Sequence, residues 1–287
     1  MHPALFRLFA HAALLIGFTV SAASAGQAPA PAPTLAVADR NSTQSYPIAA
    51  LLKHPAAREI DIADDSVYHR PMHYLAVPVA ELLKGLALSA DDYVEVKALD
   101  GFSVSIPGHL LTAPIGSATE AFLAIETPGR DWLALPDKKP AKTAGPFYVV
   151  WQVKAPATIG PEYWAYQVAS LKVTDSPQRR WPALGISADA PAQSTLRHGL
   201  ELFVSNCMAC HRFNGAGEAL LGPDLGSPMN PAHYFQRAAL KTLIRKPSAV
   251  RTWPQAQMSG FDEATLGDAD IDAVIDWLEY KARTSTP

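Results

Sequence analysis

The sequence is short of cysteine, of charge and of long apolar runs, and each shortage excludes a class of protein. Only two cysteines, Cys207 and Cys210, occur among 287 residues. Two are too few for a four-cysteine zinc site or a disulfide-built scaffold. The net charge of −3 gives no indication of a nucleic-acid partner. Because 48% of the residues are hydrophobic, we expect ordered domains with buried cores.

One apolar run stands at the N-terminus, and no other run could cross a membrane. His2 and Arg7 precede the run at 8–20, and Ala23-Ser24-Ala25 is a small-x-small cleavage pattern. An uncleaved anchor is the alternative, but the run is short for a span. We therefore expect a cleaved signal peptide at 1–25, and no transmembrane segment in the exported protein.

The remaining chain divides by composition into two expected domains. Residues 26–33 are rich in Ala and Pro and predict an extended tether. Residues 34–174 predict a β-rich α+β domain, 175–192 a proline-containing linker, and 193–287 an all-α domain. In the linker we expect Arg179 and Arg180 to form a solvated pair.

A β-hairpin is the clearest pattern of the first domain. Val94 and Val96 alternate with charged residues, Asp100-Gly101 is a turn signal, and apolar residues alternate with serines over 102–106. Pro78 and Gly85 bracket a short helix. Further strands are expected at 60–62, 74–77, 122–125, 147–153 and 166–173.

Two clusters in this domain allow more than one interpretation. His69, Met72 and His73 could hold copper, but a surface turn around Pro71 is the simpler explanation. An aromatic-rich stretch predicts a sheet core, with an exposed docking face as the alternative. Its members are Tyr148, Trp151, Tyr163, Trp164 and Tyr166.

The second domain carries Cys207-Met208-Ala209-Cys210-His211, the C-x-x-C-H pattern typical of covalent haem attachment. Two thiols on one turn can reach one porphyrin, and the next residue can bring an imidazole to the iron. A disulfide, a thioredoxin-like pair or half of a zinc site are the alternatives. The additional histidine and the preceding helical pattern favour haem.

With Gly222-Pro223-Asp224-Leu225, a G-P-x-L step, the last third of the chain resembles class I c-type cytochromes. The resemblance implies one covalently attached haem c, and attachment outside the bacterial cytoplasm predicts a periplasmic protein. It also implies that the Pro223 carbonyl accepts a hydrogen bond from His211. Gly199 would let the first and last helices cross closely, and Trp277 would pack near the first helix.

The sixth iron ligand implied by the resemblance is Met258, in the loop 253–261. Ser259 replaces the proline of the family's M-P-x-F step. A thioether ligand raises the reduction potential and closes the iron to substrates. Met229 and Met208 are the competing methionines.

Helix signals surround this loop. Asn230-Pro231 predicts a helix that ends before Pro247. Its expected apolar side is formed by Tyr234, Phe235, Ala238 and Leu243. Asp268 begins the last helix, where acidic residues favour the dipole. The apolar faces of the first and last helices are formed by Leu196, Leu200, Phe203, Val204, Ile271, Val274, Ile275 and Leu278.

The first domain resembles the molybdopterin-binding fold of sulfite oxidase-like enzymes. The residues that carry this resemblance are Arg70-Pro71-Met72, 77–83, 100–107, 121–126 and Gly145-Pro146. That family binds molybdenum through a cysteine thiolate, and no cysteine precedes Cys207. We therefore expect the fold without a molybdenum cofactor.

These features predict a periplasmic monohaem electron carrier and not an enzyme. Redox proteins are the expected partners: a dehydrogenase upstream, and a terminal oxidase or another cytochrome downstream. The main alternative is a fused oxidoreductase whose first domain binds a substrate or second cofactor and passes electrons to the haem. A sensor with a labile Met258 and a peroxidase-like haem are further alternatives.

Overall fold

Nine strands between Thr34 and Thr174 form two sheets, which with their short helices make the β-rich part of the chain. The computed structural model describes residues 32–136, 140–155, 157, 159–190 and 193–284. The expected signal peptide and residues 26–31 of the tether lie outside these residues. The five-stranded sheet has the order β2-β1-β9-β5-β6, in which β1 and β9 are parallel. Its strands are β1 (Thr34–Ala38), β2 (Thr43–Pro47), β5 (Tyr93–Ala98), β6 (Ser103–Pro107) and β9 (Val168–Thr174).

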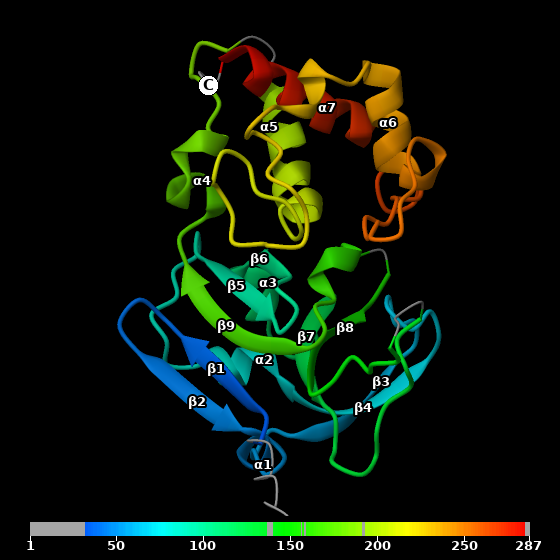
Figure 1. The fold of residues 1–287 in the computed structure, drawn as a ribbon. Coiled ribbons are helices and arrows are strands. Elements are labelled where there is room, and N and C mark those ends of the chain that lie inside the picture. Colours follow the sequence, from blue (N-terminus) through cyan, green and yellow to red (C-terminus); the bar gives the residue numbers. More distant parts are fainter. Residues whose placement is uncertain (1–31, 137–139, 156, 158, 191–192, 285–287) are drawn as a thin grey trace, which may run out of the picture. The chain divides into compact units, whose positions relative to one another are not determined.

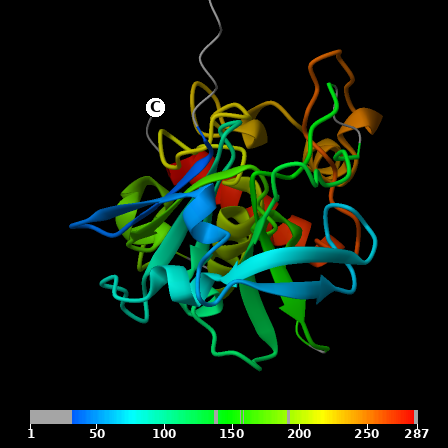
Figure 2. The same cartoon turned by 90° about the horizontal axis from the view of Figure 1, so that it is seen from below.

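The four-stranded sheet is antiparallel throughout, in the order β3-β4-β7-β8. Blue β1 and β2 lie to the left and cyan β3 and β4 to the right in both views (Figures 1 and 2). The strands of this sheet are β3 (Arg58–Ile62), β4 (Met72–Pro78), β7 (Thr119–Ile125) and β8 (Phe147–Val153). Short helical segments join the strands: α1 (Ile48–Leu51), α2 (Val79–Leu83), α3 (Gly108–Leu111) and the 3₁₀ turn η1 (Pro161–Tyr163).

The predicted hairpin is confirmed, and β5 and β6 pair from Tyr93 to Pro107 in register. Val94 and Val96 are fully buried, as the alternation predicts. Glu95 is buried too, which the pattern did not predict, because Arg180 and Lys97 pair with its carboxylate. The aromatic-rich stretch packs into or against the sheet core, as expected.

Within residues 175–190, the described part of the predicted linker, the chain is packed. It contains α4 (Pro177–Arg180) and the 3₁₀ turn η2 (Pro182–Leu184). Leu184 is fully buried in the core of the helices that follow. The expectation of a solvated arginine pair is wrong for Arg180, whose side chain is only 17% exposed and forms two ion pairs.

The helical part runs from Gln193 to Thr284. Its elements are α5 (Gln193–Leu202), the π-helical turn η3 (Phe203–Cys207), η4 (Pro231–His233), α6 (Arg237–Arg245), η5 (Pro247–Ala249) and α7 (Asp268–Thr284). The predicted apolar faces of α5 and α7 are buried against each other. Gly199 lies at their crossing, where a Cβ atom would come within 2.0 Å of the Ala273 carbonyl oxygen.

The helix expected from Pro231 to Pro247 is interrupted. The Asn230 side chain accepts a hydrogen bond from the Ala232 amide and closes a single 3₁₀ turn. Gln236 then has an extended backbone, so α6 starts afresh at Arg237. The buried residues of α6 are Leu240 and Ile244. Of the predicted apolar side, Phe235 and Leu243 pack against the helical core, whereas Tyr234 and Ala238 are exposed.

Candidate functional site

One turn carries both cysteines and the histidine. The π-helical turn η3 ends at Cys207, whose carbonyl accepts hydrogen bonds from the amides of Cys210 (3.1 Å) and His211 (2.8 Å). Both cysteines are half-buried and are not joined in a disulfide. Two thiols and an imidazole are therefore presented by five consecutive residues, as attachment of one porphyrin requires.

His211 is oriented by the loop that follows it. Its Nδ1 atom lies 2.8 Å from the Pro223 carbonyl oxygen, so Nδ1 carries the hydrogen and Nε2 has a free lone pair. The Gly222 amide donates to the Cys210 carbonyl at 2.7 Å, and a Cβ atom on Gly222 would lie 2.5 Å from the imidazole. Burial lowers the pKa of His211. This favours the neutral form of the imidazole, which is the form that binds a metal.

The surroundings of the Cys207 thiol include a residue of the β-rich part. Burial raises its pKa to about 12, and the charges of Glu162 and Cys210 contribute to the rise. Burial likewise raises the pKa of the Glu162 carboxyl to about 7. Glu162 therefore belongs to the surroundings of the attachment turn, although it is 45 positions earlier in the chain.

The three candidate methionines have different environments. Met258 stands in a loop without helix or strand and is 40% exposed. Met229 is also exposed, just before η4, whereas Met208 is buried in the helical core. An exposed thioether in a loop is free to bind a metal, so this arrangement is compatible with Met258 or Met229 and unfavourable to Met208.

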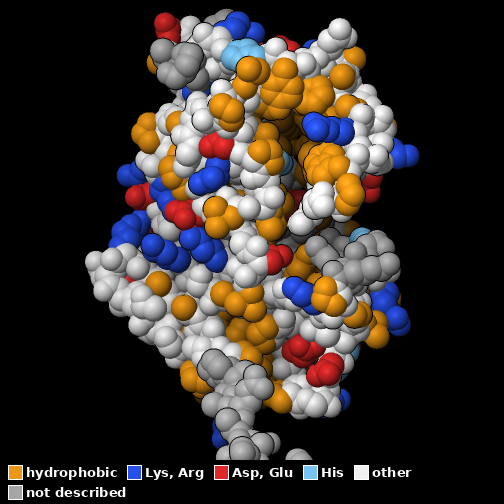
Figure 3. All heavy atoms as spheres, viewed as in Figure 1, with side chains coloured by type: hydrophobic (Ala, Val, Ile, Leu, Met, Phe, Trp, Pro, Cys, Tyr) orange, Lys and Arg blue, Asp and Glu red, His pale blue; other side chains and the backbone are white. Residues whose placement is uncertain are grey.

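Apolar side chains line a hollow in the surface of the helical part (Figure 3). Large hydrophobic residues that are exposed in this part of the chain are Leu220, Leu221, Met229, Tyr234, Val250, Trp253 and Met258. Apolar side chains that gather around a surface hollow indicate a ligand or partner surface. A large apolar ring with an iron at its centre fits the thiols, the free His211 nitrogen and this lining.

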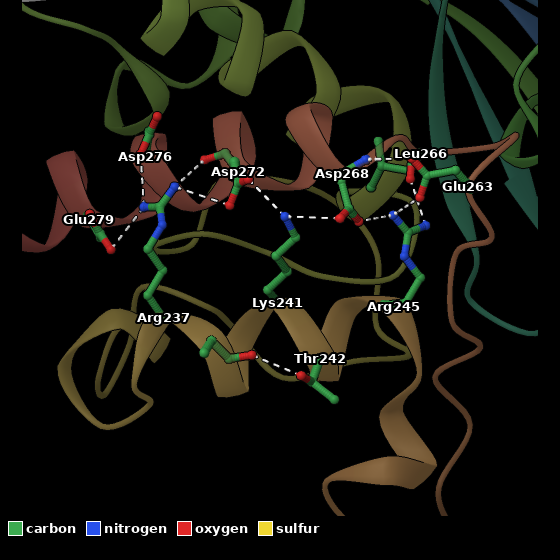
Figure 4. Close-up of polar contacts among 11 residues, drawn as sticks. Arg237, Lys241, Thr242, Arg245, Glu263, Leu266, Asp268, Asp272, Asp276 and Glu279 are labelled. Carbon is green, nitrogen blue, oxygen red and sulfur yellow. Dashed lines mark hydrogen bonds and ion pairs between the residues drawn. The ribbon is translucent and has the colours of Figure 1, made fainter.

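Sequence reasoning missed a ladder of ion pairs that joins α6 to α7 (Figure 4). Arg237, Lys241 and Arg245 are spaced by four residues on α6, so they lie on one face. Their carboxylate partners are Glu263, Asp268, Asp272, Asp276 and Glu279. The 237/241/245 spacing could have suggested such a ladder, but the sequence does not show which partners would face it.

The β-rich part contacts the attachment turn directly. The Ser103 amide donates to the Ala209 carbonyl and the Leu220 amide donates to the Gly101 carbonyl, each at 3.3 Å. Ala209 is fully buried within the core of the β-rich part. The predicted hairpin therefore covers one side of the turn that carries both cysteines.

Ion pairs reinforce this contact. Arg180 bonds Glu95 at 2.6 Å and Glu218 at 3.0 Å, and Lys97 bonds Glu218 at 3.0 Å. The Arg180 guanidinium also lies 4.1 Å from the centre of the Trp181 ring. Glu95 is on β5 and Glu218 is in the loop after the attachment turn, so Arg180, in the segment predicted as a linker, joins both parts.

The possible copper cluster is not supported. Both ring nitrogens of His73 are engaged by carboxylates, Nδ1 by Asp61 at 2.7 Å and Nε2 by Glu59 at 3.1 Å. His69 lies in a turn with a positive φ of 53°. In the described ranges, no three His, Cys, Asp or Glu side chains are arranged to hold a metal ion.

Residues 196–281 match the family model described as Cytochrome c. This match supports a c-type cytochrome in the C-terminal region and with it a haem cofactor, iron and an electron-transfer role. It leaves the β-rich part without a family match. Comparison with curated proteins gives no match for the chain. None of the helices in the described residues has the length and apolar character needed to span a bilayer.

Proposed function

We propose that this protein is a periplasmic electron carrier with one covalently attached haem c. The observation that carries the proposal is the single turn bearing Cys207, Cys210 and His211, with the His211 Nδ1 atom held by the Pro223 carbonyl. Cys207 and Cys210 would hold the porphyrin by thioether bonds, and His211 and Met258 would bind the iron. A haem bound in this way supplies reversible one-electron chemistry.

The protein's own residues would keep this chemistry confined to electron transfer. Met258 would fill the sixth position, which excludes substrates from the iron. The Pro223 carbonyl fixes the ring of His211. Redox proteins would be the partners, and the β-rich part would carry a sulfite oxidase-like fold without molybdenum.

The metal content of the mature protein, together with two ligand variants, tests this function. We expect one iron per chain, covalently held haem, and no stoichiometric molybdenum or copper. His211→Ala and Met258→Ala should each change the visible spectrum of the haem. A second stoichiometric metal would instead favour a fused oxidoreductase. An unchanged spectrum of Met258→Ala with a five-coordinate native iron would overturn the carrier.

A further inference from the structure

The loop that bears Met258 is held mainly at its ends. Among the described residues, the only backbone hydrogen bond within 252–260 joins the Ala256 amide to the Trp253 carbonyl, inside the loop itself. On its N-terminal side, the Arg251 amide bonds the Pro247 carbonyl at 3.0 Å. The position of Met258 therefore depends on what fixes the chain just before and just after this segment.

Arg245, the last residue of α6, supplies the C-terminal attachment. Its Nη1 atom donates to the carbonyl oxygens of Phe261 and Leu266, both at 2.7 Å. Its Nη2 atom bonds Glu263 at 2.8 Å and Asp268 at 2.7 Å. One guanidinium thus joins the end of α6, the residues after Met258 and the start of α7 (Figure 4).

The backbone of Arg245 contributes as well. A Cβ atom on Gly260 would lie 2.2 Å from the Arg245 carbonyl oxygen, so only glycine allows the loop to approach α6 this closely. The neighbouring Phe261 amide donates to the Ile244 carbonyl at 3.3 Å. Gly260 and Phe261 follow Met258 by two and three residues.

We propose that Arg245 is the positioning residue that holds the Met258 thioether at the haem iron. This inference rests on the proposed function, because it takes Met258 as the ligand. Arg245 suits the role because a planar guanidinium can bond two carbonyls and two carboxylates at once, which a lysine ammonium cannot. Without Arg245, the loop would spend more time with Met258 away from the iron.

Lys241 is a matched control on the same helix. It also pairs with α7, through Asp268 and Asp272, and its side chain has a similar exposure, 28% against 25% for Arg245. Its hydrogen bonds include no carbonyl of the Met258 loop. Lys241→Ala should therefore lower stability by weakening the ladder while leaving the iron ligand in place.

The test measures carbon monoxide affinity of the reduced holoprotein, its midpoint potential and its thermal stability. We expect Arg245→Ala to bind carbon monoxide at least tenfold more tightly than the wild type, about 1.4 kcal/mol, and to have a lower potential. Arg245→Lys should be intermediate and provides the result if Arg245→Ala does not fold. Lys241→Ala should match the wild type in both haem measurements.

Two results would overturn the proposal: wild-type carbon monoxide affinity in both Arg245 variants, or an equal gain in Lys241→Ala. Met258→Ala, measured in parallel, separates this failure from a failure of the proposed ligation. If Met258→Ala changes affinity and potential and the Arg245 variants do not, only the role of Arg245 is refuted. If Met258→Ala also changes neither, Met258 is not the ligand.

Discussion

The β-rich part and the helical part differ in their buried polar groups and in their exposed apolar side chains. Asp65, fully buried in the β-rich part, accepts hydrogen bonds from the amides of Val67 and Tyr68 and the hydroxyls of Tyr74 and Tyr148. The helical part instead leaves Tyr234, Trp253 and other large apolar residues exposed, and apolar side chains surround a hollow in its surface (Figure 3). The β-rich part therefore satisfies its buried carboxylate internally, whereas the exposed apolar side chains around the hollow of the helical part suit a large apolar ligand.

The difference indicates what stabilises each part. Strand pairing and buried polar contacts close the β-rich part within the chain itself. The helical part has one well-packed seam, α5 against α7, and few regular elements elsewhere. Its stability should therefore depend on the haem, because binding to the folded state adds directly to stability.

Removal of both thiols should have the largest effect. In Cys207→Ala with Cys210→Ala we expect complete loss of covalent haem, because no other cysteine exists. The helical part should lose its cooperative unfolding transition, while the β-rich part keeps its sheet signal. Haem staining on a denaturing gel and circular dichroism measure the two effects. A helical part that still unfolds cooperatively would contradict the comparison.

Loss of the buried carboxylate should have the next largest effect. Asp65→Ala leaves two amides and two hydroxyls without their acceptor, each at a cost of about 1–3 kcal/mol, so we expect a loss of at least about 4 kcal/mol. Urea unfolding followed by tryptophan fluorescence measures it. Asp64→Ala is the control, since Asp64 is exposed and should change stability by less than about 0.5 kcal/mol. Similar losses in both variants would show that the Asp65 network is not required.

The contact between the two parts should have a smaller effect. Arg180→Ala leaves the buried Glu95 carboxylate with Lys97 as its remaining ion-pair partner. We expect a loss of about 2 kcal/mol, because hydrogen bonds to charged groups are worth about 1.5–3 kcal/mol. The haem spectrum and the sheet signal, followed during one urea titration, should unfold together in the wild type and separately in the variant. Arg179→Ala, at an exposed neighbour, should behave as the wild type.

The features that could be predicted from the sequence are those with local signals. The hairpin at Val94–Ile106 and the faces of α5 and α7 follow from alternation and helical spacing, and the structure confirms them. Arg180 and Arg245 could not be found in this way. Their partners lie far away in the sequence, at Glu95 and Glu218 for the first and beyond the Met258 loop for the second. A residue whose role depends on such distant partners gives no periodic signal.

The interrupted helix at Asn230 has a related cause. The predicted N-cap at Asn230 is confirmed, since its side chain accepts a hydrogen bond from the Ala232 amide. The same side chain also donates to the Leu278 carbonyl of α7, at 3.0 Å. This tertiary hydrogen bond fixes the turn against α7, and α6 begins as a separate helix. Local rules identified the start signal but could not predict the second contact.

The smallest effect concerns Glu162, the residue of the β-rich part that affects Cys207. Because burial raises its pKa to about 7, its carboxyl binds a proton more tightly in the folded than in the unfolded state. The stability this provides is complete below the unfolded pKa, near 4.5, and is lost as pH rises through about 7. Allowing for its partial exposure, we expect the wild type to lose about 1–2 kcal/mol across this range.

Glu162→Gln should remove this part of the pH dependence, because the amide has the shape of the protonated acid and does not titrate. Urea midpoints at pH 5 and pH 8 measure the effect. The variant should gain stability over the wild type at pH 8 and match it at pH 5. Glu201→Gln, an exposed carboxyl on α5, should leave the wild-type profile unchanged. Equal profiles in the Glu162 variant and the wild type would mean that the carboxyl is solvated, and that the contact between the two parts is more open than the burial of Ala209 indicates.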